Sequence, residues 1–129
     1  MTTITDNGLE WLSDAALGFN SEEIDAIAVG TGAGNEGTGA TSLTAEEYRA
    51  DQTSEDVVFI ETDTTGAFEA IITVTGDQEV PAGTEITEIA VFAGETDSNP
   101  TMIVIDEFSA VTIENGHTEE FTIPIDITR

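Results

Sequence analysis

The sequence predicts a mainly-β protein: an antiparallel β-sandwich of about six to seven strands with a short N-terminal helix. Apolar and polar residues alternate with period two over much of the chain after residue 57. Turn signals recur there about every 8–12 residues, a spacing typical of sandwiches rather than parallel sheets. With 39% hydrophobic residues, a chain of 129 residues can bury a core, and we interpret residues 1–129 as a single domain.

Residues 1–20 are expected to form a helical arm. The helix is predicted over 5–17, with Thr5 or Asp6 as its cap and Gly18 at its end. Its apolar stripe consists of Leu9, Leu12, Ala16 and Leu17. Trp11 lies on another face of the same helix.

The middle of the chain combines a strand with a glycine-rich loop. Residues 24–29 are predicted to be the first strand. Five glycines between positions 30 and 39 make regular structure impossible, so 30–42 is expected to be a loop. We expect 42–49 to form a short turn of helix that buries Leu43 and Tyr48.

The remainder of the chain is predicted to be strands joined by turns. The strands are expected at 57–61, 68–75, 86–93, 102–108 and 111–114, with a turn at Pro81-Ala82-Gly83 and a polar loop over 94–100. Asn115-Gly116 predicts a hairpin. Its return strand carries Phe121, Ile123, Ile125 and Ile127 on one face. Pro124 on the other face indicates a sheet edge or a bulge.

The charge excludes several classes of partner. There are 27 Asp and Glu residues against two Arg and no Lys, which gives a formal net charge of -25. Such a surface repels nucleic-acid phosphates and anionic lipids, and only Arg49 and Arg129 could hold a phosphate. Because the screening length falls from about 10 Å at 0.1 M salt to about 3 Å at 1 M, we expect the protein to work in concentrated salt. An acidic protein from ordinary salt is the alternative.

Two further classes of feature are missing from the sequence. Without Cys there are no disulfides, thiolate nucleophiles or zinc–sulfur sites. No apolar run approaches the length of about 20 residues that spans a bilayer. Residues 1–6 lack the basic and apolar regions of a secretory signal, so we expect neither membrane insertion nor secretion by that route.

The glycine-rich loop matches a nucleotide-binding spacing without its context. Gly32-x-Gly34-x-x-Gly37 follows a strand, as in dinucleotide-binding folds. There, however, a helix begins at the third glycine and holds the pyrophosphate. The residues after Gly37 do not begin an amphipathic helix. We therefore interpret the segment as a flexible surface loop, or as one that becomes ordered against a neighbouring subunit.

Cation binding and catalysis have only weak candidates. Residues 61–66 resemble the start of a calcium loop, but Ile72 stands where the bidentate Glu is required. Loose binding of Na⁺, K⁺ or Mg²⁺ is open to Asp63, Asp97 and Asp106, and no cofactor is expected. His117 follows the predicted hairpin turn and is expected to pair with Glu114. Because it has no nucleophile partner, enzyme activity is not expected.

Arg49 is the basic side chain farthest from the chain ends. Surrounded by so many acids, it is expected to form a salt bridge that fixes the polar segment around it. We predict that Arg49→Ala lowers stability or assembly.

Three segments, taken in order, resemble a known family. They are Ile24-Asp25-Ala26-Ile27-Ala28-Val29-Gly30-Thr31-Gly32, then Leu43-Thr44-Ala45-Glu46-Glu47-Tyr48-Arg49, then Ile86-Thr87-Glu88-Ile89-Ala90-Val91-Phe92. The order and spacing are similar to those of small tailed-phage virion proteins and tail-fibre N-terminal domains. Ala90-Val91 departs from the Gly-Leu usual in that family, and the basic residues common near its later strands are absent.

The resemblance implies a structural protein of a tailed virus, and the charge points to a haloarchaeal host. The expected location is the virion, assembled in the host cytoplasm at high salt: in the tail as fibre, adaptor or baseplate, or on the capsid as decoration or turret. The expected partners are further copies of the chain and other virion proteins. Structural or assembly roles are assigned to Trp11, Gly30, Gly32, Tyr48, Arg49, Glu88 and Phe92. The alternative is a receptor- or carbohydrate-binding module on the virion surface, with a host surface receptor as its partner.

Overall fold

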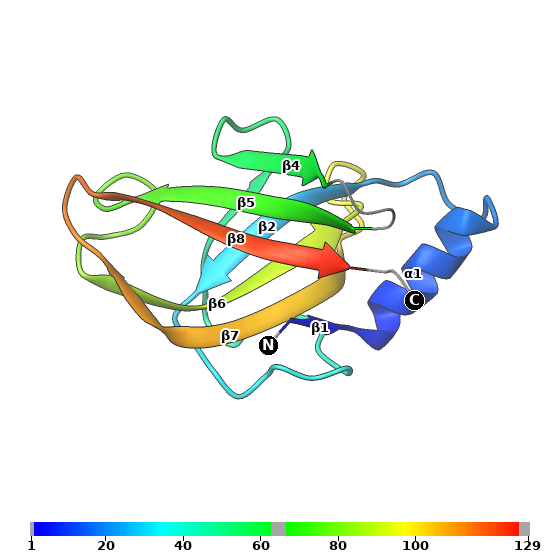
Figure 1. Ribbon diagram of the computed structural model, residues 1–129, viewed down its shortest axis with the longest axis horizontal. Coiled ribbons are helices and arrows are strands. Elements are labelled where there is room, and N and C mark those ends of the chain that lie inside the picture. Colours follow the sequence, from blue (N-terminus) through cyan, green and yellow to red (C-terminus); the bar gives the residue numbers. More distant parts are fainter. Residues whose placement is uncertain (1, 63–66, 127–129) are drawn as a thin grey trace.

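The computed structural model describes residues 2–62 and 67–126. They form two antiparallel sheets that pack face to face, with a helix at one end (Figure 1), so the predicted mainly-β sandwich is confirmed. One sheet has the strand order β1-β7-β6-β2-β3 and the other β4-β5-β8. The strands are β1 (Thr3–Ile4), β2 (Ile24–Gly30), β3 (Glu46–Asp51), β4 (Val57–Glu61), β5 (Ala67–Thr75), β6 (Thr84–Ala93), β7 (Thr101–Ile113) and β8 (Thr118–Asp126). The described residues thus hold eight strands rather than six or seven, because β1 and β3 were not predicted.

The helix α1 (Asp6–Ala16) lies where the sequence predicts it. Thr5 caps it: the Thr5 hydroxyl accepts a hydrogen bond from Gly8 N over 2.8 Å and donates one to the Met102 carbonyl over 2.6 Å. A Cβ at Gly8 would lie 2.5 Å from the Ile103 carbonyl oxygen. The helix therefore approaches β7 so closely that only glycine fits at this contact. None of the described helices is long and apolar enough to cross a membrane.

The main core lies between the two sheets. Ile27 and Val29 of β2 face Ile72 and Val74 of β5, and all four side chains are fully buried. Burying each such side chain contributes about 1.5–3 kcal/mol, so this layer is the principal source of stability. The alternation predicted for β5 is confirmed, because its inward positions are the buried ones.

A second apolar cluster lies on the outer face of the five-stranded sheet. It contains small side chains from the sheet together with residues that cover them: Ala26, Ala28, Ala40, Leu43, Ala90, Phe92, Met102 and Ile105. The segment between β2 and β3 covers this face. Consequently β2 is buried on both faces, which explains why its alternation in the sequence is imperfect.

The turn of helix predicted over 42–49 is wrong. Residues Glu46–Asp51 instead form β3, an edge strand antiparallel to β2, with Val29 opposite Tyr48 and Ala28 opposite Arg49. Leu43 is buried, as expected. A short polar segment has little intrinsic preference of its own, so pairing with the exposed edge of β2 decides its conformation.

The two strands predicted at 102–108 and 111–114 are one long strand with a bulge. In the ladder between β6 and β7, Ile86 lies opposite Val111 while Glu88 lies opposite Glu107. Two steps along β6 therefore correspond to four along β7, a register shift typical of a bulge. The strand itself continues without a break to Ile113.

The predicted hairpin at Asn115-Gly116 is also wrong. Gly116 has the positive φ of +74° that the turn requires, and His117 N donates to the Glu114 carbonyl over 3.1 Å. The strands on either side, however, belong to different sheets, and β8 pairs with β5 along nine residues. This turn carries the chain from one sheet to the other.

The proline in β8 marks a sheet edge, as predicted. Strand β8 is the outer strand of the three-stranded sheet, and Pro124 lies opposite Glu69 of β5. Phe121, Ile123 and Ile125 point into the core. Ile127, predicted to share that face, is outside the described residues.

Candidate functional site

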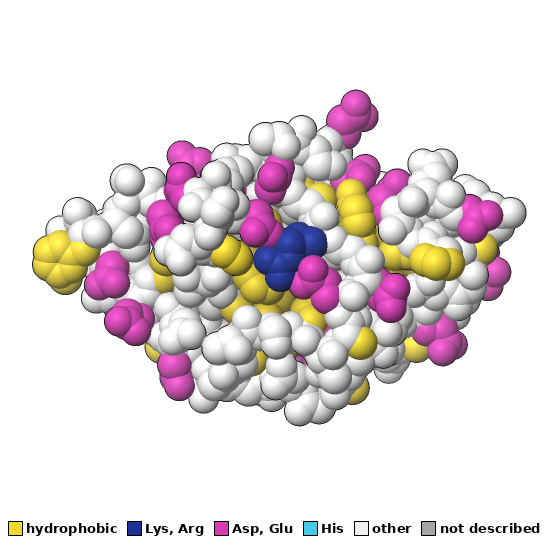
Figure 2. Space-filling model, turned by 180° about the vertical axis from the view of Figure 1, so that it is seen from behind, with side chains coloured by type: hydrophobic (Ala, Val, Ile, Leu, Met, Phe, Trp, Pro, Cys, Tyr) yellow, Lys and Arg dark blue, Asp and Glu magenta, His cyan; other side chains and the backbone are white. Residues whose placement is uncertain are grey.

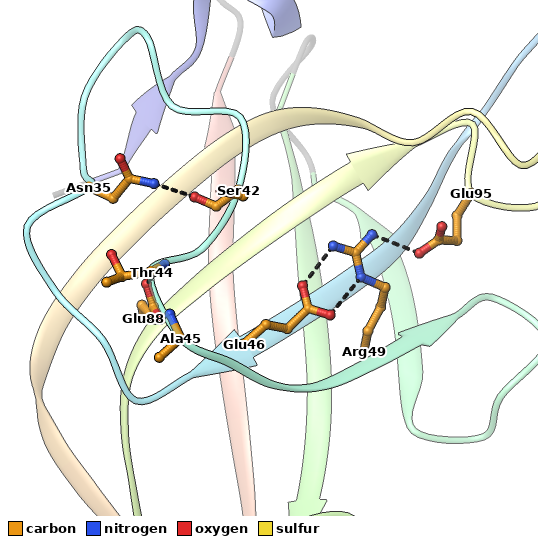
Figure 3. Close-up of polar contacts among 8 residues, drawn as sticks. All are labelled: Asn35, Ser42, Thr44, Ala45, Glu46, Arg49, Glu88 and Glu95. Carbon is orange, nitrogen blue, oxygen red and sulfur yellow. Dashed lines mark hydrogen bonds and ion pairs between the residues drawn. The ribbon is translucent and has the colours of Figure 1, made fainter.

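A buried glutamate joins the glycine-rich loop to the five-stranded sheet. Glu88 lies on β6, is completely buried, and accepts three backbone hydrogen bonds. Gly32 N and Ala45 N donate to its Oε2 over 2.9 and 2.8 Å, and Thr44 N donates to its Oε1 over 2.9 Å. Figure 3 shows the Glu88 carboxylate beside the backbone at Thr44 and Ala45. Because these bonds offset the cost of burying a charge, Glu88 fixes both ends of the loop.

Gly30 and Gly32 provide the space that this carboxylate occupies. A Cβ at Gly30 would lie 2.5 Å from Glu88 Oε2 and would overlap the Ala45 carbonyl. A Cβ at Gly32 would lie 2.9 Å from the same oxygen and 2.5 Å from the Thr44 side chain. Three of the residues assigned assembly roles in the sequence, Gly30, Gly32 and Glu88, are therefore one cluster.

A second carboxylate holds the tip of the loop. Glu107 of β7, which lies directly opposite Glu88, accepts hydrogen bonds from Gly34 N, Asn35 N and Glu36 N over 3.1, 2.8 and 3.0 Å. The Glu36 carboxylate accepts from Glu107 N in return. The tip of the loop is thus held by a side chain of its own chain. Several of the amides that a bound phosphate would use already donate to carboxylates.

Arg49 forms the predicted salt bridge, and it does so with two carboxylates. Its guanidinium donates two hydrogen bonds to Glu46, over 3.1 and 2.7 Å, and one to Glu95 over 2.8 Å. Its carbon Cζ lies 3.9 Å from the centre of the Phe92 ring, a cation–π distance. Figure 2 shows the dark-blue side chain between acidic side chains and above an apolar floor. Arg49 therefore links β3, β6 and the loop that follows β6.

The environment keeps this guanidinium charged. Burial lowers the pKa of Arg49, but the hydrogen bonds and charges of Glu46 and Glu95 outweigh burial and raise it above the ordinary value. The guanidinium is planar and permanently charged, so it can bond two carboxylates and stack on a ring at the same time. A lysine ammonium group cannot reproduce this combination.

Tyr48 faces away from Arg49 and belongs to a different cluster. Its hydroxyl donates to Asp56 Oδ2 over 2.7 Å. Burial, and then the hydrogen bond and charge of Asp56, raise the pKa of Tyr48 to about 12. The contact ties β3 to the segment that precedes β4. Its role is local stabilisation.

A third carboxylate with a similar function is not indicated by any pattern in the sequence. Asp25 is completely buried at the start of β2. It accepts from Glu95 N and Thr96 N, each over 3.0 Å, and from the Thr96 hydroxyl over 2.8 Å. Asp25 thereby holds the loop after β6 in place beside Arg49. In a chain with 27 acids, no sequence signal separates these few buried acceptors from the solvated majority.

The weak cation candidates are not brought together. Asp63 is outside the described residues, Asp97 lies in the loop after β6, and Asp106 lies on β7. Over residues 2–62 and 67–126, no group of three or more His, Asp or Glu side chains is placed to hold a metal ion.

Most of the apolar stripe predicted for the N-terminal helix is exposed: Leu9, Ala16 and Leu17 are exposed, and Leu12 is half-buried. Helix α1 contacts the sheet through Gly8 and Trp11, whereas Leu9 and Leu17 are 55% and 64% exposed. Phe19, just beyond the helix, is 75% exposed. We call Leu9, Leu17 and Phe19 the helix stripe. They are three of the five large apolar side chains that are exposed among the described residues, so we take the helix stripe as the candidate interface.

Comparison with known proteins gives no match: none was found among protein-family models, curated proteins or solved structures.

Proposed function

We propose that the protein is a structural component of the virion of a tailed virus that infects a haloarchaeal host, and that it acts by packing into a symmetric homo-oligomer. The viral part of the proposal is supported by the order of the three motif segments. The assembly part is supported by one observation, the exposed helix stripe on an otherwise strongly acidic surface.

The three motif segments are neighbours in space. The first forms β2 and its following turn, the second leads into β3, and the third forms β6, and these strands lie side by side in the order β6-β2-β3. Glu88 bonds the first and second segments, and Arg49 of the second stacks on Phe92 of the third. Residues far apart in the sequence thus form one structural unit, as expected if the motif order reflects a shared framework.

Concentrated salt makes association of such acidic subunits feasible. Each added copy brings a formal charge of -25, and at about 1 M salt these charges are screened beyond about 3 Å. The helix stripe then supplies apolar surface whose burial favours association. Closed, symmetric arrangements are the usual outcome for identical subunits.

Sedimentation analysis in concentrated salt tests the assembly. The double variant Leu17→Ser/Phe19→Ser should shift the protein to a smaller species, because it removes apolar surface from the stripe. Val58→Ser is the matched control, since Val58 is 47% exposed on β4, outside the helix. A wild-type protein that is monomeric in about 1 M salt would contradict the proposed assembly.

Mass spectrometry of purified virions tests the location. The protein should be recovered in stoichiometric amounts from intact particles after washing at high salt. Recovery only from the infected-cell extract would contradict a virion role.

A further inference from the structure

We infer that the cleft beside Trp11 is a binding site for a neutral saccharide. This inference does not depend on the oligomeric state. The cleft lies between α1, the segment that joins it to β2, and the start of β7, and it has a volume of about 500 Å³. Small-molecule sites typically occupy about 300–1,000 Å³, so a sugar unit or two fits.

Hydrogen bonds hold the side chains that form one wall of the cleft. Trp11 packs against the main core on one side and lines the cleft on the other. Its indole Nε1 donates to Glu22 Oε1 over 3.1 Å, and the Asn99 side-chain amide donates to Glu22 Oε2 over 2.9 Å. Glu22 therefore holds both an aromatic and an amide side chain at the cleft wall. An indole held by such a partner offers a rigid apolar surface with a polar edge.

The lining is rich in hydrogen-bond acceptors. Glu10 and Asp14 line the cleft from the polar side of α1, and Asn20 lines it from the following segment. Asn20 Oδ1 is buried and has no hydrogen-bond partner among the described residues. The Nδ2 of the same amide donates to the Trp11 carbonyl over 3.5 Å, which holds this side chain beside the indole. The site calls for a ligand that carries several donors.

Charge and chemistry select the class of ligand. No Lys or Arg is among the described residues that line the cleft, so anionic sugars are repelled. Both oxygens of Glu22 already accept hydrogen bonds within the protein, and the remaining carboxylates at Glu10 and Asp14 are screened in concentrated salt. Hydroxyl groups both donate to carboxylates and bond to amides, while the C–H face of a sugar ring packs on an indole. A neutral saccharide satisfies all of these features.

None of the three residues of the helix stripe, Leu9, Leu17 and Phe19, lines the cleft. The side chains that line the cleft are therefore distinct from those proposed for assembly. Binding and assembly are consequently separable by substitution.

The intrinsic fluorescence of the protein provides a direct test, because Trp11 is the only tryptophan. We would titrate the full chain, in about 1 M NaCl, with glucose, galactose, mannose and N-acetylglucosamine, and with glucosamine and glucuronate as the cationic and anionic counterparts of glucose. At least one neutral sugar should change the Trp11 emission saturably, and glucuronate should not. No response to any neutral sugar up to about 100 mM, well above a millimolar Kd, would overturn the inference.

Two variants on the solvent side of the helix keep both the reporter and the core contact of Trp11. Asp14→Asn and Glu10→Gln should each weaken binding of the responding sugar about tenfold, the loss expected for one hydrogen bond to a charged acceptor. Glu47→Gln, which removes one charge from an exposed position of β3 outside the cleft, should bind as wild type does. Unaltered binding in both helix variants would overturn the site, and saturation by glucosamine alone would show that it binds cations rather than neutral sugars.

Discussion

The buried carboxylate of Glu88 gives the sharpest test of how the glycine-rich loop is held. Replacing it by glutamine keeps the size of the side chain but leaves only one acceptor oxygen. With that oxygen at the Oε2 position, the hydrogen bonds from Gly32 and Ala45 survive, whereas the new NH₂ group faces the Thr44 N–H. One hydrogen bond is therefore lost and a donor is placed against a donor.

The expected loss follows from these contacts. A hydrogen bond to a charged group contributes about 1.5–3 kcal/mol, and the two that remain become neutral and weaker. We expect Glu88→Gln to lower the free energy of unfolding by about 2–3 kcal/mol. Glu88→Ala leaves all three N–H groups without the carboxylate and should cost about 3–5 kcal/mol. Against a typical total of about 5–15 kcal/mol, either loss is large.

Urea unfolding in about 1 M NaCl, followed by the emission of Trp11, measures these differences. Glu85→Gln is the matched control, because Glu85 lies on the same strand, carries the same charge and is exposed. It should stay within about 0.5 kcal/mol of wild type. If Glu88→Gln were as stable as Glu85→Gln, the carboxylate would not be what holds the loop.

Four further predictions follow from other contacts. Gly32→Ala should destabilise the fold by about 1–3 kcal/mol, whereas Gly39→Ala, whose Cβ would meet nothing within 4 Å, should not; equal melting temperatures would contradict this. Arg49→Lys should cost about 1–2 kcal/mol by calorimetry, because lysine cannot reproduce its forked hydrogen bonds, and an unchanged stability would contradict the assigned role. The raised pKa of Tyr48, about 12, implies stability that is fully present below pH 10 and is lost as pH rises toward 12; ultraviolet titration of this only tyrosine measures it, and a midpoint near 10 would contradict the Asp56 contact. Lowering NaCl from about 1 M to tens of millimolar should reduce the cooperativity of thermal unfolding, and a salt-independent transition would argue against adaptation to concentrated salt.

Elements with a strong local pattern were predictable. The alternation of β5 and β8 follows from having one face on the core, and the helix start follows from the cap at Thr5. The predictions of secondary structure failed where pairing with a segment far away in the sequence determines the conformation. Nothing local to 46–51 specifies a strand, because that segment becomes one only by pairing with β2. Nothing local to Asn115-Gly116 shows that the strands it joins lie in different sheets.

The candidate sites divide in the same way. The salt bridge of Arg49 was predictable, since one cation among many acids must find a carboxylate. Its stacking on Phe92 was not, because that contact depends on the register between β2, β3 and β6. The cleft beside Trp11 escaped prediction because its lining comes from three segments that meet only in the fold. The direction of the helix was not predictable either: helical spacing revealed the apolar stripe of α1 but not that most of it is exposed to water.

The acidic residues serve two purposes that respond differently to salt. Most are exposed, and their mutual repulsion weakens as ionic strength rises. Asp25 and Glu88 are buried and bonded to backbone N–H groups, and such short contacts are hardly screened. A chain without lysine thus anchors its loops with backbone donors in place of ammonium groups. Removing salt should therefore increase repulsion over the whole surface while leaving these hydrogen bonds intact. Unfolding at low salt should then begin with separation of the two sheets rather than with release of the glycine-rich loop.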